Sequence, residues 1–312
     1  MACLQIVKSN TAFDLPREKL KQYFSRADLF FSRDTHLCFV CGAAGDIIPD
    51  TGHSSLRAMF IDHVAQRGDS KIVCVRAETA ATELLRQIDE RGQNISTFEK
   101  TIAETVDSVL IFPESPGSFA ELGYFSAHDA IARKTLVAVR TQHQANSFIT
   151  LGPVHAISRV SLFAPSPIAL GDPPAAQMPQ IAERLLGDTL TKRTYRQRFE
   201  KQTWKGYDSR HQLAILDEII DLVGATTETD LRHAVSECFG PYDVSIIRLQ
   251  LAILVATVRV ARNDNGDIFS RARTVPFIEA NSQETLAMKA TWRRALEQHD
   301  PTALSELEGI RK

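Results

Sequence analysis

The sequence lacks three features that would each define a class of protein. No apolar run reaches the length of a membrane span, and the start has no apolar core of a signal peptide. The formal net charge is only -2, which excludes a general attraction of the whole molecule to nucleic acid. Among the five cysteines, Cys38 and Cys41 have no second pair that would complete a zinc site. We therefore expect a cytoplasmic protein with reduced cysteines, no bound metal and no membrane contact.

The composition of the chain is that of a folded globular protein. Hydrophobic residues make up 44% and charged residues 24% of the sequence, so nothing indicates disorder. A length of 312 residues suits about two domains, each large enough to bury a core. We place the boundary near Lys201, with a catalytic domain over residues 1–200 and a smaller domain over residues 201–312.

The segment from Val106 to Phe125 has the pattern of a strand, a tight turn and a helix. The branched run Val109–Phe112 predicts a central parallel strand, and the Pro, Ser and Gly residues after it end that strand. Ligands of open α/β sheets bind at the carboxyl ends of strands. Gly117 and Ser118 would lie where a helix offers unpaired amides to a phosphate or ribose hydroxyl, with Glu121 one turn further on.

This spacing also has a purely structural explanation. Acidic residues are common near the start of a helix because they complement the helix dipole. Turns made of Pro, Gly and Ser are ordinary connectors between elements. The spacing alone therefore leaves a structural and a catalytic interpretation of Glu121 open.

The identities of the residues in this segment indicate a protein family more specifically than their spacing does. The run Gly117–Tyr124, Gly-Ser-Phe-Ala-Glu-Leu-Gly-Tyr, resembles the signature of nucleoside 2-deoxyribosyltransferases. The longer run Phe112–Gly123 closely resembles toxic effectors of bacterial retrons, which couple a deoxyribosyltransferase-like domain to a C-terminal DNA-binding domain. The resemblance covers roughly the first two thirds of the chain and departs from those effectors at the longer loop Ala43–Gly52. Other segments fall in a similar order and spacing, namely Ser55–Arg57, Ala77-Glu78, Glu83–Leu85, Ser96–Glu99, Ile102–Glu104 and Ser147–Val154.

Cleavage of a ribosyl C–N bond requires a carboxylate against the anomeric carbon, where positive charge develops. The resemblance implies that Glu121 is this nucleophile and that Glu114 lies near a further acidic position of the active site. Glu78, at the end of a neighbouring strand, is expected to bind ribose hydroxyls or protonate the leaving base. A solvated carboxylate is an equally good explanation of Glu78 and Glu114. The expected substrate-binding residues are Gly42, Arg57, Gly117, Ser118 and Glu99, and the weaker candidates are Asp107 and His53.

Strands alternate with helices in the first two thirds of the chain. This order predicts an α/β fold with a Rossmann-like parallel sheet of the deoxyribosyltransferase type, covered by helices on both faces. We expect strands at 37–41, 71–75, 109–112, 135–139 and 159–163, and helices at 15–31, 54–64, 79–89, 96–106 and 180–191. Residues 164–179 are rich in proline and are expected to form a loop.

The last third predicts a small winged-helix-like α+β domain. Helices are expected at 211–223, at 227–238 and from Asp243 on, followed by a hairpin over 258–271 and a helical segment over 282–307. Its arginines either contact DNA phosphates or stay solvated in a domain that docks a protein or dimerises. The third helix is mostly apolar, so contact with structured DNA or a protein is favoured over sequence readout. The arginines in question are Arg248, Arg259, Arg262, Arg271 and Arg273.

Three functions from different classes remain open. The first is a toxic N-glycosidase that cleaves the nicotinamide–ribose bond of NAD, and the resemblance implies a reverse transcriptase and its RNA-linked DNA as partners. The second is a transferase or hydrolase of deoxynucleosides or nucleotides, favoured by the match at Glu121–Tyr124. The third is a nucleotide-sensing or DNA-binding regulator without turnover, against which the set Glu78, Glu114 and Glu121 argues. NAD or a nucleotide is the expected substrate; we expect no cofactor, and a homo-oligomer.

Overall fold

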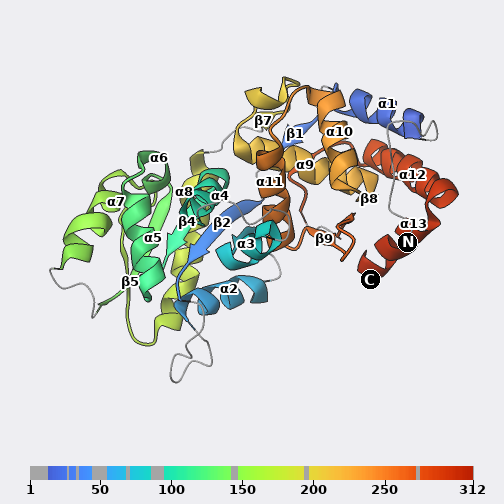
Figure 1. Cartoon of the computed structure of the whole chain (residues 1–312). Coiled ribbons are helices and arrows are strands. Elements are labelled where there is room, and N and C mark those ends of the chain that lie inside the picture. The colour runs from blue at the N-terminus through green and yellow to red at the C-terminus, as the bar shows by residue number, and fades with distance from the viewer. Residues whose placement is uncertain are drawn as a thin grey trace. The chain divides into compact units, whose positions relative to one another are not determined.

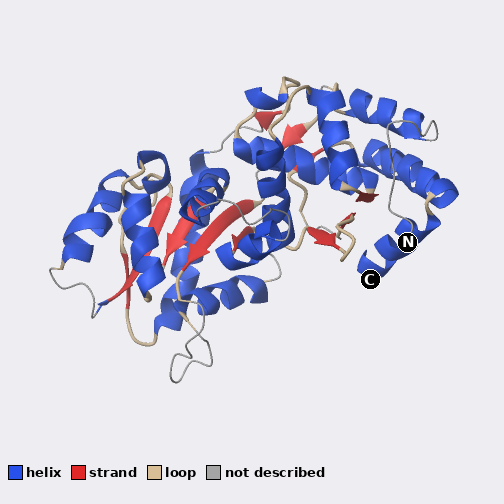
Figure 2. Cartoon of the chain, in the orientation of Figure 1, coloured by secondary structure: helices blue, strands red, loops and turns tan. Residues whose placement is uncertain are grey.

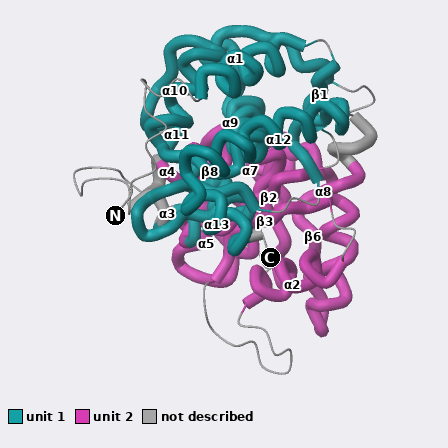
Figure 3. Tube along the Cα trace, turned by 90° about the vertical axis from the view of Figure 1, so that its right-hand side faces the viewer, with its two compact units in different colours: residues 1–34, 79–90, 195–312 teal, residues 35–78, 91–194 magenta. Residues whose placement is uncertain are grey.

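The computed structural model describes residues 13–26, 28–32, 35–43, 55–67, 71–85, 95–141, 147–192, 197–271 and 275–311. They form a mixed α/β structure with many helices and three sheets (Figures 1 and 2). The chain divides into two compact units (Figure 3): unit 1 holds residues 1–34, 79–90 and 195–312, and unit 2 holds residues 35–78 and 91–194. This division differs from the expected one at its start, because residues up to Asp34 belong to the unit that contains the C-terminal part of the chain.

Unit 2 is built on a five-stranded parallel sheet with the order β3-β2-β4-β5-β6. All residues of the two central strands β2 and β4 are buried, which explains why their sequences are continuous apolar runs rather than alternating patterns. The register places Cys41 of β2 beside Ile111 of β4. The strands are β2 (His36–Cys41), β3 (Ile72–Val75), β4 (Ser108–Ile111), β5 (Thr135–Arg140) and β6 (Ile168–Leu170).

Helices cover both faces of this sheet (Figure 1). Cys38 and Val40 of β2 point to the face on which α2 and α8 pack, whereas Phe39 points to the other face, where its ring meets Phe125 of α5 at 6.2 Å between centroids. The elements between and after the strands are α2 (Leu56–Gln66), α3 (Ala77–Leu85), α4 (Ile95–Thr105), α5 (Pro116–Ser126), α6 (Asp129–Ala132), η3 (Thr150–Val154), α7 (His155–Val160), η4 (Pro174–Gln177) and α8 (Met178–Lys192).

The strand order determines where a ligand can bind. From β2 the chain moves to β3 on one side and then returns to β4, β5 and β6 on the other side. The connections that follow β2 and β4 therefore diverge to opposite faces, so the carboxyl ends of these two strands form a topological switch point, where ligands of open α/β sheets bind. Gly42 and the Pro113-Glu114 turn lie at this point.

Most expected strands and helices of unit 2 are confirmed, and the expected strand at 159–163 is wrong. Residues His155–Val160 are helical, and the last strand is β6, inside the segment expected to be a loop. Ile168 and Leu170 are buried and Ala169 between them is exposed, so only this alternation marks the strand. Because β6 is a short edge strand, a proline can precede it directly without breaking a ladder.

The expected helix at 15–31 is also too long. Helix α1 (Asp14–Tyr23) ends early, and Phe30–Phe31 form β1, which pairs antiparallel with β7 (Gln197–Arg198) and β11 (Ile278–Glu279). Both partners are distant in the sequence. Tertiary pairing has here overridden a local helical pattern, which no short window of sequence reveals.

Unit 1 contains the three helices and the hairpin that the sequence predicts. The side chains of Asp208, Thr227 and Asp243 each accept a backbone N–H at the start of a helix. The segment at 282–307 lies within two helices divided at Pro301, which lacks the N–H that a continuing helix needs. The further elements are η5 (Trp204–Gly206), α9 (Ser209–Val223), β8 (Ala225–Thr226), α10 (Glu228–Phe239), α11 (Val244–Ala256), β9 (Val260–Arg262), β10 (Ile268–Ser270), α12 (Ser282–His299) and α13 (Pro301–Arg311).

Length and hydropathy single out no individual helix of the described residues as able to cross a membrane. Only α10 and α11 taken together, bent by 115° at their junction, meet the same test.

Ion pairs hold the hairpin of unit 1 to its helices. Arg259 donates two hydrogen bonds, of 3.0 and 2.7 Å, to the carboxylate of Asp217 on α9, and both side chains are buried. A further ion pair links two of the helices, because Arg248 of α11 donates a 2.8 Å hydrogen bond to Glu228 of α10. Of the two readings left open for these arginines, contact with DNA phosphates and solvation, neither describes Arg259, because its guanidinium is buried and ion-paired with Asp217. Arg273 lies outside the described residues.

Candidate active site

The turn between β4 and α5 is fixed by its own hydrogen bonds. Ser115 is the N-cap of α5, and Ser118 completes a capping box three residues later. Pro116 takes the first helical position, where its missing N–H has no cost. Glu121 consequently lies in the second turn of α5 rather than the first. The helix dipole acts mainly within the first turn, so it does not account for this carboxylate.

Glu121 is largely buried and its ionisation is strongly perturbed. Burial raises the pKa of Glu121 to about 7, and the carboxylates of Glu99 and Glu78 raise it further. The neighbouring Cys41 thiol and the positive charge of Arg57 act in the opposite direction and lower the pKa. Glu121 therefore lies in an acidic environment in which a positive charge would be favourable.

Two further acidic side chains complete this environment. Glu99 on α4 has its pKa raised by burial and then by the charge of Glu78. Glu78, in the first turn of α3, accepts a 2.7 Å ion-paired hydrogen bond from Arg57 Nη1. Its side chain is 54% exposed, whereas that of Arg57 is 11% exposed. Glu78, Glu99 and Glu121 thus lie near enough to act on one another's ionisation, and the Arg57 guanidinium is paired with Glu78.

Glu114 caps the N-terminus of α2. Its carboxylate accepts the backbone N–H groups of Ala43 at 3.0 Å, Leu56 at 3.0 Å and Arg57 at 3.4 Å. Gly42 is needed beside it, since a Cβ there would lie 2.8 Å from both Arg57 Cβ and Glu114 Oε1. Glu114 was expected to be catalytic and Gly42 to bind substrate. Both therefore have a structural role, because they fix the position of α2 against the turn.

Ser118, which was expected to bind a phosphate, also has a structural role, because its hydroxyl is used in hydrogen bonds within the turn. Its hydroxyl accepts the N–H groups of Glu114 at 3.0 Å and Ser115 at 2.9 Å, and donates to the Ser115 carbonyl oxygen at 2.9 Å. A hydroxyl has one proton and two acceptor positions, so none remains for a ligand. Gly117 is exposed on the first turn of α5, where its backbone N–H can meet an anion.

Of the two weaker candidates, Asp107 has a structural role outside the carboxylate group. Asp107 precedes β4, and its carboxylate accepts the N–H of Leu37 at 2.8 Å, which makes it a strand-end cap. His53 lies outside the described residues. Within the described parts of the chain, no three His, Cys, Asp or Glu side chains are grouped so that they could hold a metal ion.

The sequence predicts Cys41 to be a reduced thiol and gives it no role in the site, yet it lies in this region. It is 1% exposed, and its pKa is raised well above the ordinary value, first by burial and then by Glu121. The period-2 alternation along β2 was the available signal, because it separates Cys41 from Cys38 by face.

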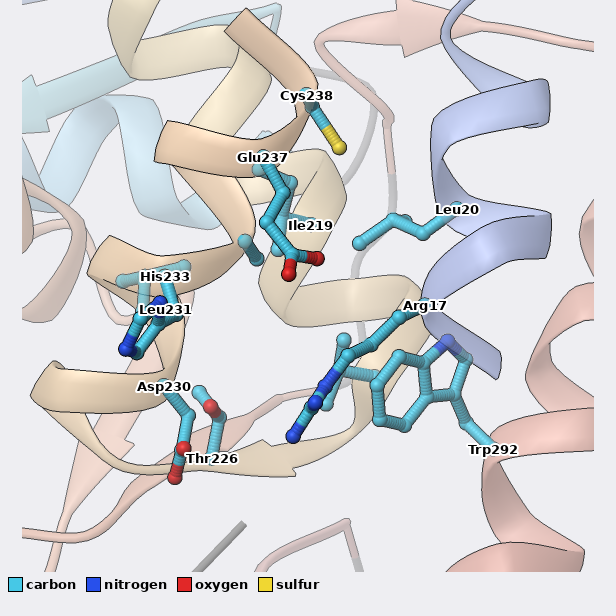
Figure 4. Close-up of a pocket in the computed structure, with 12 residues that line it drawn as sticks. Arg17, Leu20, Ile219, Thr226, Asp230, Leu231, His233, Glu237, Cys238 and Trp292 are labelled. Atoms are coloured by element: carbon cyan, nitrogen blue, oxygen red, sulfur yellow. The ribbon is translucent and has the colours of Figure 1, made fainter. Parts of the chain in front are cut away.

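Unit 1 contains a small cavity of its own. Arg17 of α1, Glu237 of α10 and Trp292 of α12 point into it (Figure 4). The interior space is about 20 Å³, which is room for about one water molecule and not for a nucleotide. The indole N–H of Trp292 has no hydrogen-bond acceptor among the described residues.

Fold and site together define an α/β protein with a group of acidic side chains at the carboxyl edge of its parallel sheet. Residues 53–262, more than half of the 312-residue chain, match the model of the STM3845 retron effector protein family. The chain belongs to this family.

Two curated proteins of Escherichia coli are similar to this chain. It is 34% identical over 123 residues to the "Retron Ec86 putative ribosyltransferase/DNA-binding protein" and 27% identical over 124 residues to the corresponding Ec73 protein. Each match covers 39% of this chain, and 37% of the Ec86 and 38% of the Ec73 protein. The chain thus spans less than half the length of these relatives.

Proposed function

We propose that unit 2 is an N-glycosidase that cleaves the bond between nicotinamide and ribose in NAD, and that the chain is the toxic effector of a retron-type antiphage system. The observation that carries the proposal is the group of Glu78, Glu99 and Glu121, with the Arg57 guanidinium paired to Glu78, at the switch point of a parallel sheet. Membership of the retron effector family supports the role in a retron.

The charge of the site favours this substrate. The nicotinamide ring of NAD is a pyridinium cation, and further positive charge develops on the sugar as the C–N bond breaks. A group of carboxylates stabilises both charges. Nicotinamide leaves as a neutral molecule when the bonding electron pair moves to its ring nitrogen, so the leaving group needs no proton.

Glu121 acts as the nucleophile in its ionised form. One carboxylate oxygen bonds to the anomeric carbon while the bond to nicotinamide breaks, and water then attacks this carbon and releases Glu121. The proton of that water passes to a neighbouring carboxylate, for which Glu99 has a suitably raised pKa. Glu78, steered by Arg57, binds ribose hydroxyls, and the N–H of Gly117 faces a phosphate. Glu114 acts through α2 as a positioning residue.

Incubation of the purified chain with NAD tests the proposal. We expect equal amounts of nicotinamide and ADP-ribose, and no release from Glu121→Gln, which keeps the size of the side chain and removes its charge. Glu183→Gln, a neutralised exposed carboxylate on α8, is the matched control and should retain activity. Turnover by Glu121→Gln, or a wild type inert toward every nucleotide and nucleoside, would contradict the assignment; the latter would point to a non-catalytic nucleotide-sensing or DNA-binding regulator.

A nucleoside deoxyribosyltransferase or hydrolase is the second candidate. The raised pKa of Glu99 favours it, because a neutral purine or pyrimidine must be protonated as it leaves and a carboxylic acid beside the nucleophile supplies that proton. The names of both curated relatives contain the term ribosyltransferase. Base release from deoxynucleosides, with NAD left intact, would select this candidate.

We further propose that unit 1 contains a winged-helix-like domain that docks the effector on a retron reverse transcriptase and its RNA-linked DNA. Three helices, α9, α10 and α11, precede the β9–β10 hairpin, and β8 forms the third strand of its sheet. Because Arg259 and Arg248 are held in ion pairs, we favour contact with a protein or structured DNA over base readout. Co-expression should recover all three components in one complex, and sedimentation of the effector alone tests the expected homo-oligomer.

A further inference from the structure

A cluster of charged side chains lies in unit 1, where α10, α11 and the hairpin strand β9 meet. Its centre is Glu228, the first residue of α10, and three arginines approach the carboxylate of this residue. Arg248 of α11 donates a 2.8 Å hydrogen bond to it, while guanidinium nitrogens of Arg232 and Arg262 lie 3.8 and 3.9 Å from its oxygens. We call these four residues the Glu228 cluster.

Positive charge exceeds negative charge in the Glu228 cluster. One carboxylate faces three guanidinium groups, and a guanidinium does not lose its proton in proteins. Asp230, the other acid in the first turn of α10, accepts a 2.6 Å hydrogen bond from the Thr227 hydroxyl. The surface around Glu228 is therefore cationic, although the whole chain has a formal net charge of -2.

The three arginines differ in how far their donors are already used. Arg262 is largely buried, and its Nε and Nη2 donate to the carbonyl oxygen of Gly266 at 3.3 and 3.2 Å, which fixes it within the hairpin. Arg232 donates no hydrogen bond within the described residues. The side chains of Arg232 and Arg248 are 25% and 35% exposed, so both reach the surface. These two arginines can therefore receive an anion from solvent, with Arg262 behind them.

We propose that the Glu228 cluster binds phosphate groups of a nucleic-acid backbone, with Arg232 and Arg248 as the donors to the phosphate oxygens. The inference rests on the proposed docking of unit 1 on RNA-linked DNA and assigns a surface to it. A guanidinium presents a planar fork of N–H donors that matches two oxygens of a phosphate. Phosphate contacts require no reading of bases, which agrees with the apolar and mostly buried α11.

Glu228 has two opposing effects in this site. It holds the guanidinium groups in place before a ligand arrives, which reduces the side-chain entropy that binding would otherwise cost. Its negative charge also cancels part of the attraction for a phosphate. Removal of that charge alone should therefore strengthen the binding of DNA, whereas removal of an arginine charge should weaken it.

Binding of the whole chain to a labelled DNA hairpin with a single-stranded tail tests the inference. Fluorescence anisotropy gives the affinity between about 50 and 200 mM salt. Arg232→Gln and Arg248→Gln each remove one positive charge, and Glu228→Gln removes the carboxylate between them. Arg293→Gln is the matched control, because Arg293 is an exposed arginine of the same unit that pairs with Glu308 outside the cluster. Thermal unfolding shows whether each variant is folded.

We expect Arg232→Gln and Arg248→Gln each to weaken binding about five- to tenfold at low salt and to lower the slope of log affinity against log salt by about one. Glu228→Gln should bind more tightly than wild type, which a loss of packing alone cannot produce. Arg293→Gln should match the wild type. Equal affinity and slope in the wild type and both cluster variants would overturn the inference, while the proposed docking stands if co-expression still recovers the complex.

A wild type that binds no DNA would overturn the inference as well, and co-expression then identifies what has failed. If Arg232→Gln and Arg248→Gln lost the reverse transcriptase that the wild type retains, the Glu228 cluster would be a surface for a protein. If the wild type recovered neither the reverse transcriptase nor its RNA-linked DNA, the proposed docking itself would be refuted.

Discussion

Neutralising Glu121 should make the protein more stable above pH 7. Burial and two neighbouring carboxylates raise the pKa of Glu121 from 4.5 to about 7. Between these values the unfolded chain releases a proton that the folded protein retains, so the folded state loses stability as the pH rises. Each tenfold change in proton affinity corresponds to about 1.4 kcal/mol, which sets an upper limit of roughly 3 kcal/mol above pH 7. Glutamine carries no charge and avoids this cost.

Denaturant unfolding of wild type and Glu121→Gln from pH 5 to pH 8 measures the effect. The advantage of the variant should be small at pH 5 and grow to roughly 2–3 kcal/mol at pH 8. Glu183→Gln, an exposed position on α8, controls for the loss of a negative charge and should show no such growth. An advantage independent of pH, or a variant less stable than wild type at pH 8, would show that Glu121 is not destabilised by its surroundings.

Three further predictions concern the packing and ionisation of the two units. The wild-type kcat/KM for base release should rise with an acidic limb near pH 7, because Glu121 must be ionised in the free enzyme; a limb near the ordinary carboxyl range would contradict this. Gly42→Ala should cost about 1–3 kcal/mol in unfolding free energy, since its Cβ would lie 2.8 Å from two neighbouring atoms, whereas Gly187→Ala meets nothing within 4 Å and should not destabilise. Asp217→Ala should cost about 3–5 kcal/mol by leaving the buried guanidinium of Arg259 unpaired, and thermal unfolding close to wild type would refute the stated burial.

Local patterns in the sequence were sufficient for most elements. The apolar runs of β2 and β4 and the caps Thr227 and Asp243 predicted their strands and helices, because short-range sterics and capping bonds determine them. Local sequence patterns gave the wrong secondary structure where pairing with a strand distant in the sequence determines the conformation. Phe30–Phe31 became a strand through β7 and β11, and β6 formed at the edge of the sheet between prolines.

The same distinction applies to the candidate site. The sequence pointed to Glu121, Glu78 and Glu99, since they follow or flank predicted strands and match a family motif. It could not tell that Glu114 caps α2 with both oxygens, because the N–H groups involved come from residues more than fifty positions earlier in the chain. It also gave no reason to connect Cys41 with Glu121, whose pKa values affect each other in the fold in which β2 and β4 pair in parallel.

The sequence by itself determined the α/β class, the order of most elements and the identity of the acidic residues, because these depend on side-chain periodicity, capping and a short motif. Only the tertiary structure decided which carboxylates share one environment, which serve as caps, and how far the ionisation of Glu121 is displaced. The reason is physical: desolvation and the field of neighbouring charges depend on distances across the fold, and the switch point of the sheet exists only where β2 and β4 lie side by side.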